Sequence, residues 1–197
     1  MIVVISNCQT AGIASAVHSL LPQHEVRHFH VGHPDLFTPG EVVDAVRQAD
    51  ACLSLPLGSE WGEMEITNLE SRGNVRRFPS FIFTGFHPDC ILAWRSPGHY
   101  IPSPMVYHSL IIASGYCLGY SEGRVAGLFC EDIFAAFGYK EAFVQSLSAL
   151  SNVWNEVGLD VSPLVERWLA RGVFCYTINH PKSYVITSLA YKILKDT

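Results

Sequence analysis

The chain has 197 residues, of which 49% are hydrophobic and 16% are charged, with a formal net charge of −5 and a pI of about 5.9. This length suffices for one domain that buries about 70% of its unfolded surface, and the apolar composition excludes a disordered chain. The acidic net charge argues against a protein that binds the phosphate backbone of nucleic acids.

The first residues, Met1–Ile5, form an apolar run that lacks the basic flank of a signal peptide and the length of a membrane span. We therefore expect a cytoplasmic protein without a membrane span. Six cysteines lie mostly inside apolar runs without a CxxC pair, and we expect them to be free thiols: Cys8, Cys52, Cys90, Cys117, Cys130 and Cys175.

The first half of the chain alternates strands and helices. Met1–Ile5 predicts a strand, and apolar residues at helical spacing over Ala11–Leu21 predict the helix that follows. The same alternation continues with a strand over Glu25–Val31, a helix from Pro39, a strand over Asp50–Leu57, a loop over Gly58–Gly62 and a strand over Phe78–Thr84. This order predicts an α/β fold with a central, mostly parallel sheet covered by helices on both faces.

Helical spacing dominates the second half. A proline-rich loop over residues 96–104 precedes a helical region from about Met105 to Trp168. Glycines interrupt that region near Gly119, Gly138 and Gly158. A β-rich segment over Val173–Ile178 and a helix over Tyr184–Leu194 close the chain. We expect a single domain over residues 1–197, with the helical stretch at about 105–168 as an insertion or lid.

Ligands of parallel α/β sheets bind at the carboxyl ends of the strands, so the loops that follow strands hold the candidate site residues. These loops are Ser6–Gln9, Leu57–Glu60 with Gly58, Gly85–Asp89 and Asn179–Pro181.

Cys8 lies where the first predicted strand turns into a helix. Its sulfur is expected near the positive end of the helix dipole, which lowers a thiol pKa. The N–H groups there, with the side chains of Asn7 and Gln9, could stabilise an oxyanion. An inert cysteine also suits this position, and the residues alone leave both interpretations open.

His180 follows the last predicted strand and is expected at the same sheet edge as Cys8, which would give the minimal pair for acyl transfer. Three residues remain open as the group that orients its imidazole: Thr177, Asn179 and Asp89. His87 and Asp89 flank the rigid Pro88, and they could bind substrate, orient His180 or only stabilise a turn.

Four histidines crowd into a short segment, but they lack recognised metal-ligand spacing, so we expect no metal: His24, His28, His30 and His33. Basic residues near the predicted loops could meet the phosphates of a nucleotide-bearing ligand, or could simply be solvated: Arg72, Arg76, Arg77, Arg95, Arg124 and Lys182. Glycine-rich motifs of dinucleotide-binding and P-loop proteins are absent from the sequence.

Three motifs occur in order: Val-Ile-Ser-Asn-Cys-Gln, Phe-Ile-Phe-Thr-Gly-Phe-His-Pro-Asp and Thr-Ile-Asn-His-Pro. With them the chain resembles, over nearly its whole length, the WcbI family of polysaccharide-biosynthesis acetyltransferases. The resemblance implies an SGNH-hydrolase-like three-layer α/β fold, coenzyme A binding, and O-acetylation of capsular or exopolysaccharide sugars. It maps the nucleophile to Cys8 and the catalytic histidine to His180, while Thr177 stands where hydrolases of this fold have an acid.

The expected function is therefore transfer of an acetyl group from acetyl-CoA to a sugar hydroxyl. Substrate or oxyanion contacts are expected from Asn7, Gln9, Gly58, His87, Asp89 and Asn179, and phosphate contacts to coenzyme A from Arg76, Arg77, Arg95 and Lys182. Two alternatives stay open: an esterase or thioesterase on the same scaffold, and a non-catalytic module that binds a CoA-like or glycan ligand.

Overall fold

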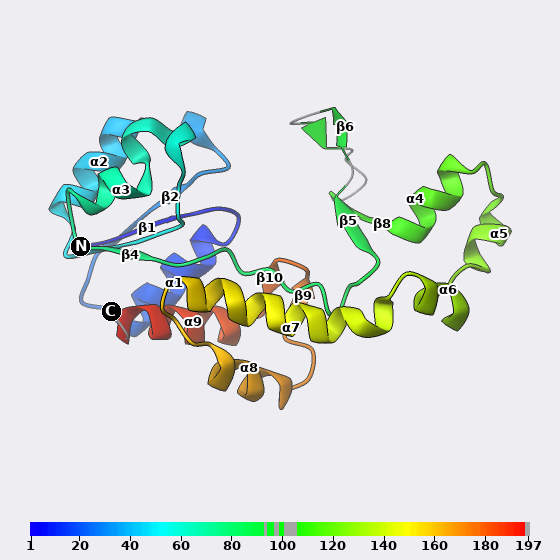
Figure 1. Cartoon of the computed structure of the whole chain (residues 1–197). Coiled ribbons are helices and arrows are strands. Elements are labelled where there is room, and N and C mark those ends of the chain that lie inside the picture. Colours follow the sequence, from blue (N-terminus) through cyan, green and yellow to red (C-terminus); the bar gives the residue numbers. More distant parts are fainter. Residues whose placement is uncertain (93, 97–98, 101–105, 196–197) are drawn as a thin grey trace. The chain divides into compact units, whose positions relative to one another are not determined.

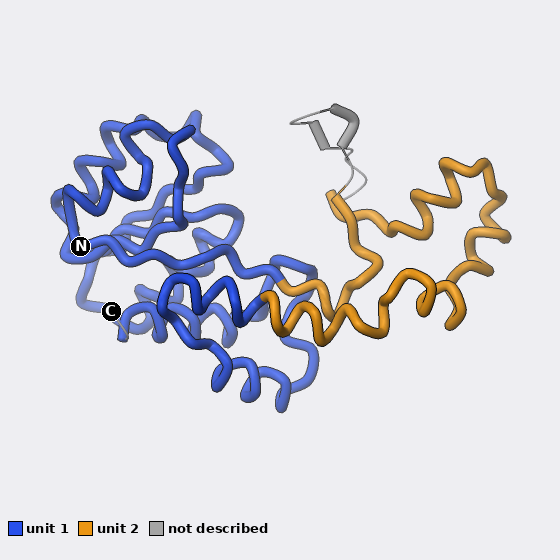
Figure 2. Tube along the Cα trace, viewed as in Figure 1, with its two compact units in different colours: residues 1–82, 150–197 blue, residues 83–149 orange. Residues whose placement is uncertain are grey.

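The computed structural model describes residues 1–92, 94–96, 99–100 and 106–195 (Figure 1). Figure 2 shows its two compact units: unit 1 comprises residues 1–82 and 150–197, and unit 2 comprises residues 83–149. Unit 2 begins well before the predicted helical insertion, and the single domain with an insertion at about 105–168 stays a prediction.

Unit 1 is built around a four-stranded sheet in the order β2-β1-β3-β4, and each neighbouring pair is parallel. Its strands are β1 (Ile2–Ser6), β2 (Val26–His30), β3 (Ala51–Ser54) and β4 (Val75–Arg77). Every residue of β1 and β3 is buried, as expected for central parallel strands covered on both faces, whereas the edge strand β2 is partly exposed. The predicted α/β class is confirmed.

Helices cover both faces of this sheet: Figure 1 shows α2 and α3 on one side, and α1 and α9 on the other. The helices of unit 1 are α1 (Thr10–Leu20), η1 (Pro34–Leu36), α2 (Pro39–Gln48), η2 (Ser59–Met64), α3 (Ile66–Glu70), α8 (Ser162–Leu169) and α9 (Ser183–Lys195). The short 3₁₀ helix η2 replaces the loop predicted over Gly58–Gly62. Helices α1 and α9 approach closely at Gly12. A Cβ on this glycine would lie 2.9 Å from Cδ1 of Ile186, so the side chain of Ile186 would have to shift to admit one.

The strand order places a topological switch point at β1. The chain leaves β1 for β2 on one side and later enters β3 on the other. Open α/β sheets bind ligands in the crevice outside the carboxyl ends of the strands at such a point. The loop that follows β1 contains Cys8.

The predicted fourth strand over Phe78–Thr84 is wrong, because the strand that joins the sheet is β4 at Val75–Arg77. The last bond from this segment to β3 runs from the N–H of Phe78 to the carbonyl of Ser54, at 3.0 Å. Pro79 follows and has no N–H to donate, so the ladder stops there. Phe78 and Phe81 are nevertheless buried, which explains why their apolar pattern resembled a strand.

The β-rich segment near the C-terminus forms a hairpin of its own. Strand β9 (Cys175–Thr177) pairs antiparallel with β10 (His180–Pro181), with Thr177 opposite His180. The β-rich segment predicted over Val173–Ile178 contains β9. The sequence also predicted that His180 lies at the edge of the main sheet. The hairpin instead forms a separate two-stranded sheet in unit 1.

Unit 2 combines short antiparallel strands with helices. Strand β5 (Cys90–Leu92) pairs with β8 (Tyr107–Ser109), and β6 (Trp94–Ser96) pairs with β7 (His99–Tyr100). The helices are α4 (Leu110–Cys117), α5 (Glu122–Ala126), α6 (Glu131–Ala136) and α7 (Tyr139–Glu156), and α7 ends in unit 1. The sequence missed all four of these strands, and β7 lies within the stretch 96–104 that was predicted to be a loop. Met105, where the predicted helical region begins, lies outside the described residues.

The glycine breaks predicted in the helical region are confirmed. Gly119, Gly138 and Gly158 have φ angles of 69°, 70° and 80°, a left-handed conformation that side chains with a Cβ rarely adopt. In the described part of the chain, none of the helices has both the length and the apolar character needed to cross a membrane.

Candidate active site

The turn that contains Cys8 is fixed by Asn7. The carbonyl of Asn7 accepts hydrogen bonds from the N–H of Thr10 at 2.9 Å and from its Oγ1 at 2.5 Å. Oδ1 of Asn7 accepts from the N–H of Gln9 at 3.1 Å, and Nδ2 of Asn7 donates to Oγ of Ser80 at 2.8 Å. The backbone on both sides is held in place, and Cys8 is exposed as a residue although its sulfur is partly covered by Asn7 and Asn179.

The buried side chain of Gln9 connects its own loop to two other segments by hydrogen bonds. Its Nε2 donates to the carbonyls of Phe81 at 2.7 Å and Asn179 at 2.9 Å, and its Oε1 accepts from the N–H of Phe81 at 3.1 Å. A primary amide has two protons, and these two carbonyls use both. The geometry therefore gives this side chain a structural role in place of the oxyanion contact expected from the sequence.

Asn179 connects Cys8 with the histidine. Its Nδ2 donates to Sγ of Cys8 at 3.7 Å, and its Oδ1 accepts from Oγ1 of Thr177 at 3.3 Å. Oγ1 of Thr177 also lies 2.7 Å from Nδ1 of His180. Cys8, Asn179, Thr177 and His180 thus form one continuous chain of contacts. Two of the three partners left open for His180, Thr177 and Asn179, belong to it.

The pKa of Cys8 differs from the sequence expectation. Partial burial of the sulfur raises the pKa of the Cys8 thiol above its ordinary value, and the backbone N–H of Cys8 offsets this only in part. The prediction of a thiol pKa lowered by the helix dipole is therefore wrong. At neutral pH the group is a thiol, so a base must remove its proton before it can act as a nucleophile.

We expect alkylation of Cys8 by iodoacetamide to reach half its maximal rate at a higher pH in the folded protein than in the protein unfolded in urea. The thiolate is the reacting form, and burial disfavours this charged form, so the midpoint moves upward. Mass spectrometry must follow the peptide that carries Cys8, because Cys117 and Cys130 are also exposed. A midpoint in the folded protein at or below that in urea would show that the site stabilises the thiolate.

The remaining basic candidates have different surroundings. Arg76 donates through Nη1 to the carbonyl of Leu194 at 2.7 Å, at the C-terminal end of α9. Arg77 forms an ion pair with Glu70, at 2.5 Å from Nε to Oε1. Nζ of Lys182 lies 5.8 Å from the ring centre of Tyr176, next to the His180 hairpin. Both arginines therefore have structural partners. Arg95 lies in β6, and its side chain is outside the described part.

Gly58 follows β3 at the same edge of the sheet as the Cys8 loop. It precedes η2, and its carbonyl accepts from the N–H of Trp61 at 3.1 Å. A Cβ at this position would meet the carboxyl group of Glu60. The glycine thus allows a tight turn beside the switch point, and a role in substrate binding stays a prediction.

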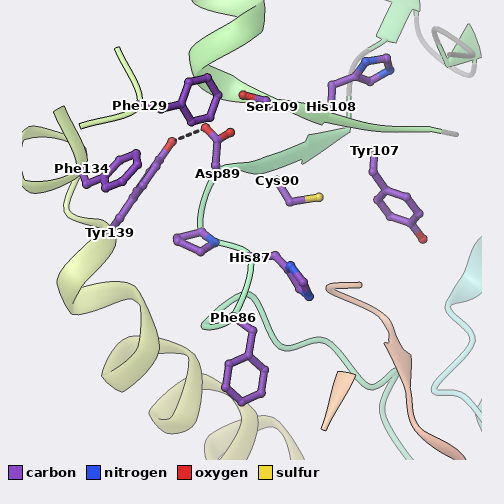
Figure 3. A pocket seen from close by; sticks show the side chains of 11 residues that line it. Phe86, His87, Asp89, Cys90, Tyr107, His108, Ser109, Phe129, Phe134 and Tyr139 are labelled. Atoms are coloured by element: carbon purple, nitrogen blue, oxygen red, sulfur yellow. Dashed lines mark hydrogen bonds between the residues drawn. The ribbon is translucent and has the colours of Figure 1, made fainter. Parts of the chain in front are cut away.

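His87 and Asp89 belong to unit 2. Oδ1 of Asp89 accepts from the hydroxyl of Tyr139 at 2.6 Å and from the N–H of Ile111 at 3.1 Å. Both residues line a cavity, drawn in Figure 3, together with Tyr107, Phe129 and other residues of unit 2. Nε2 of His87 is buried, with no hydrogen-bond partner among the described residues. The sequence pointed to His87 and Asp89 but gave no signal for Tyr139.

The histidine-rich segment forms pairwise contacts. Nδ1 of His24 lies 3.5 Å from Oδ2 of Asp50, and the rings of His30 and His33 lie 4.7 Å apart. Within the described ranges, no group of three or more His, Cys, Asp or Glu side chains could hold a metal ion.

Comparison with known proteins assigns the chain to a family. A solved structure of WcbI, a polysaccharide biosynthesis enzyme, matches 98% of this chain and 68% of its own chain, with a TM-score of 0.72 and 17% sequence identity. It is described as the native protein without a disulfide bond between coenzyme A and a cysteine. A search of curated proteins finds no match. The family "Polysaccharide biosynthesis enzyme WcbI" matches residues 1–197. The chain belongs to the WcbI family of polysaccharide biosynthesis enzymes.

Proposed function

We propose that this protein is an acyltransferase that moves the acetyl group of acetyl-CoA to a sugar hydroxyl during capsular or exopolysaccharide biosynthesis. The observation that carries the proposal is the contact chain from Cys8 through Asn179 and Thr177 to His180, beside the switch point of the sheet. Family membership supplies the polysaccharide context, and the related structure is described with reference to coenzyme A and a cysteine. We propose that Cys8 is the equivalent cysteine and that the fold is of the SGNH-hydrolase type.

The contacts of Thr177 favour Nε2 of His180 as the base. If the hydroxyl of Thr177 donates its proton to Oδ1 of Asn179, its oxygen is left to accept a hydrogen bond from Nδ1–H of His180. The proton then resides on Nδ1, and Nε2 carries the lone pair. A hydroxyl thus performs the orienting task of the acid that the sequence lacks, although it cannot neutralise the imidazolium as a carboxylate would.

In the covalent route, Nε2 of His180 takes the proton of the Cys8 thiol as sulfur attacks the acetyl carbonyl. The new C–S bond to Cys8 forms as the C–S bond to coenzyme A breaks, and the leaving thiolate takes the proton from His180. A sugar hydroxyl then attacks the acetyl-cysteine, and its proton passes through His180 to the sulfur of Cys8. Thioester exchange is nearly balanced in free energy, and transfer to oxygen is downhill.

In the direct route, His180 deprotonates the sugar hydroxyl, and the oxygen attacks acetyl-CoA without an intermediate on Cys8. Mass spectrometry after exposure to acetyl-CoA separates the routes. An added acetyl group on the Cys8 peptide supports the covalent route. An active Cys8→Ala variant without any adduct on the unaltered protein excludes it.

Both routes develop negative charge on the carbonyl oxygen, and amide donors stabilise such charge. We propose Nδ2 of Asn179 as one donor, because it already faces Sγ of Cys8 at 3.7 Å. The oxyanion role expected for Asn7 has less support, because its Oδ1 faces Sγ of Cys8 at 3.9 Å while its Nδ2 donates to Ser80. For the phosphates of coenzyme A we propose Lys182 of unit 1, and a role for Arg95 stays a prediction from the sequence. Use of acetyl-CoA also implies the cytoplasm as the compartment.

A thermal-shift measurement with coenzyme A tests the proposal most directly. A ligand at about 100 times its dissociation constant adds roughly 2.7 kcal/mol to the free energy of unfolding. We expect coenzyme A and acetyl-CoA to raise the melting temperature, with adenosine as the control that lacks phosphates and thiol. Absence of any shift with coenzyme A would contradict the proposal. Release of acetate at a rate that sugars do not change would instead indicate a thioesterase.

A further inference from the structure

We propose that the cavity of unit 2 in front of Asp89 binds uncharged sugar units of the acceptor chain. This inference rests on the proposed function, because it names the site that would bind the acceptor. The cavity has a volume of about 480 Å³. Its lining residues lie in or next to β5, β8, α6 and the start of α7. That volume falls within the range of about 300–1,000 Å³ that is typical of small-molecule sites.

Aromatic rings form the walls of this cavity. Figure 3 shows Phe134 and Tyr139 on one side of Asp89 and Tyr107 on the other. The rings of Phe134 and Tyr139 are stacked, with centroids 5.9 Å apart and planes 25° apart, and Phe129 meets Phe134 edge-on. The face of an aromatic ring is electron-rich, so it attracts the partly positive C–H groups that cover one face of a pyranose ring. Phe129 keeps 45% of its surface exposed, which leaves apolar surface for such stacking.

Asp89 supplies a fixed acceptor between these walls. The Tyr139 hydroxyl and the Ile111 N–H both bond to Oδ1, which holds the carboxyl group in place. Burial and the neighbouring Asp89 raise the pKa of Tyr139, so its hydroxyl remains a donor. A carboxylate has a second oxygen, and charge-assisted hydrogen bonds to it select ligands that carry O–H groups.

Charge distinguishes a sugar from coenzyme A in this cavity. The described residues that line it include the carboxylate of Asp89 and contain neither lysine nor arginine. Beside this carboxylate the lining has the imidazoles of His87 and His108 but no permanently cationic side chain to hold the phosphates of coenzyme A, whereas neutral hydroxyl groups need none. The favoured occupant is therefore the uncharged part of an acceptor.

A second cavity shares the lining residue Phe129 with the first and provides space for a further sugar unit. It has a volume of about 520 Å³, and Phe129 lines both cavities. Tyr116 contributes aromatic surface there and is 84% exposed, whereas the guanidinium of Arg124 lies over the ring of Tyr120, 3.5 Å from its centre. A run of aromatic side chains on both sides of Phe129 suits consecutive units of an oligosaccharide.

Saturation-transfer NMR on the full chain tests this assignment, with methyl glycosides of glucose, galactose and mannose and their disaccharides at millimolar concentration as probes. We expect transfer to the ring protons of at least one probe. Phe129→Ala removes part of the wall, and Asp89→Asn removes the charge but keeps an oxygen for Tyr139 and Ile111. Each variant is expected to weaken that binding at least about tenfold. Tyr191→Ala, which removes a half-exposed aromatic side chain in unit 1, serves as the matched control and is expected to bind unchanged.

The outcomes separate this inference from the proposed function. Absence of transfer to every probe, or signals that survive both variants, overturns the sugar site even if coenzyme A still raises the melting temperature. Loss of the coenzyme A shift in Phe129→Ala, without sugar signals, assigns the cavity to the coenzyme and also overturns it. Sugar signals that both variants weaken, in a protein that does not respond to coenzyme A, support the cavity and contradict the acetyltransferase.

Discussion

Replacing His180 by alanine is expected to lower the rate of coenzyme A release from acetyl-CoA about 100- to 10,000-fold, the range associated with loss of a general base. The neutral Cys8 thiol cannot attack without a proton acceptor, and neither can a sugar hydroxyl, so both routes fail together. The rate is measured by chromatographic detection of coenzyme A with neutral pyranosides as acceptors. His180 is exposed and contributes its backbone to β10, so the variant should fold and still show the thermal shift with coenzyme A.

His18→Ala is the matched control, because His18 is an exposed histidine in the last turn of α1. It is expected to leave the rate unchanged. An equal loss in both variants would mean that the effect is not specific to His180. Full activity of His180→Ala would remove His180 from the mechanism.

Two conservative variants of Thr177 test whether its hydroxyl orients the imidazole of His180. Thr177→Val keeps the shape but loses the oxygen 2.7 Å from Nδ1 of His180, and kcat is expected to fall about 10- to 100-fold with little change in KM. Thr177→Ser restores the oxygen and should restore most of kcat. A purely structural role would instead lower stability in both variants without separating kcat from KM. Equal activity of the valine and serine variants would contradict the orienting role.

The first half of the fold follows from local patterns in the sequence. β-Branched runs such as Met1–Ile5 and helical spacing in Ala11–Leu21 depend on neighbouring residues, and the structure places β1 and α1 there. The parallel sheet then follows from the alternation of strands and helices. Cys8 could be placed at the carboxyl end of β1 on this basis alone.

The partners of the site residues depend on contacts between distant segments. Asn179 meets Cys8 because the β9–β10 hairpin packs beside the first loop, and nothing near residue 179 specifies that approach. The pKa of Cys8 shifts opposite to the expectation, because burial of the thiol in the fold outweighs the local backbone N–H. From the sequence alone, Arg76 and Arg77 were expected to be available for phosphates. Only the fold shows that their partners are the end of α9 and Glu70.

Gln9→Met is expected to lower the free energy of unfolding by about 3 kcal/mol or more, because three backbone groups lose their partner and each buried unsatisfied group costs about 1–3 kcal/mol. For a chain of this size, 1 kcal/mol corresponds to about 2–4 °C, so the melting temperature should fall by roughly 6–12 °C. Methionine matches glutamine in length, which limits the change to the lost hydrogen bonds. Gln48→Met, at an exposed position in α2, is the matched control and should change stability little.

The side-chain amide of Gln9 also holds the carbonyl of Asn179. In Gln9→Met, Cys8 should therefore lose its fixed neighbour and react with iodoacetamide at a changed rate. A loss of stability as small as that of Gln48→Met would mean that the Phe81 and Asn179 segments are held in place by their apolar packing instead.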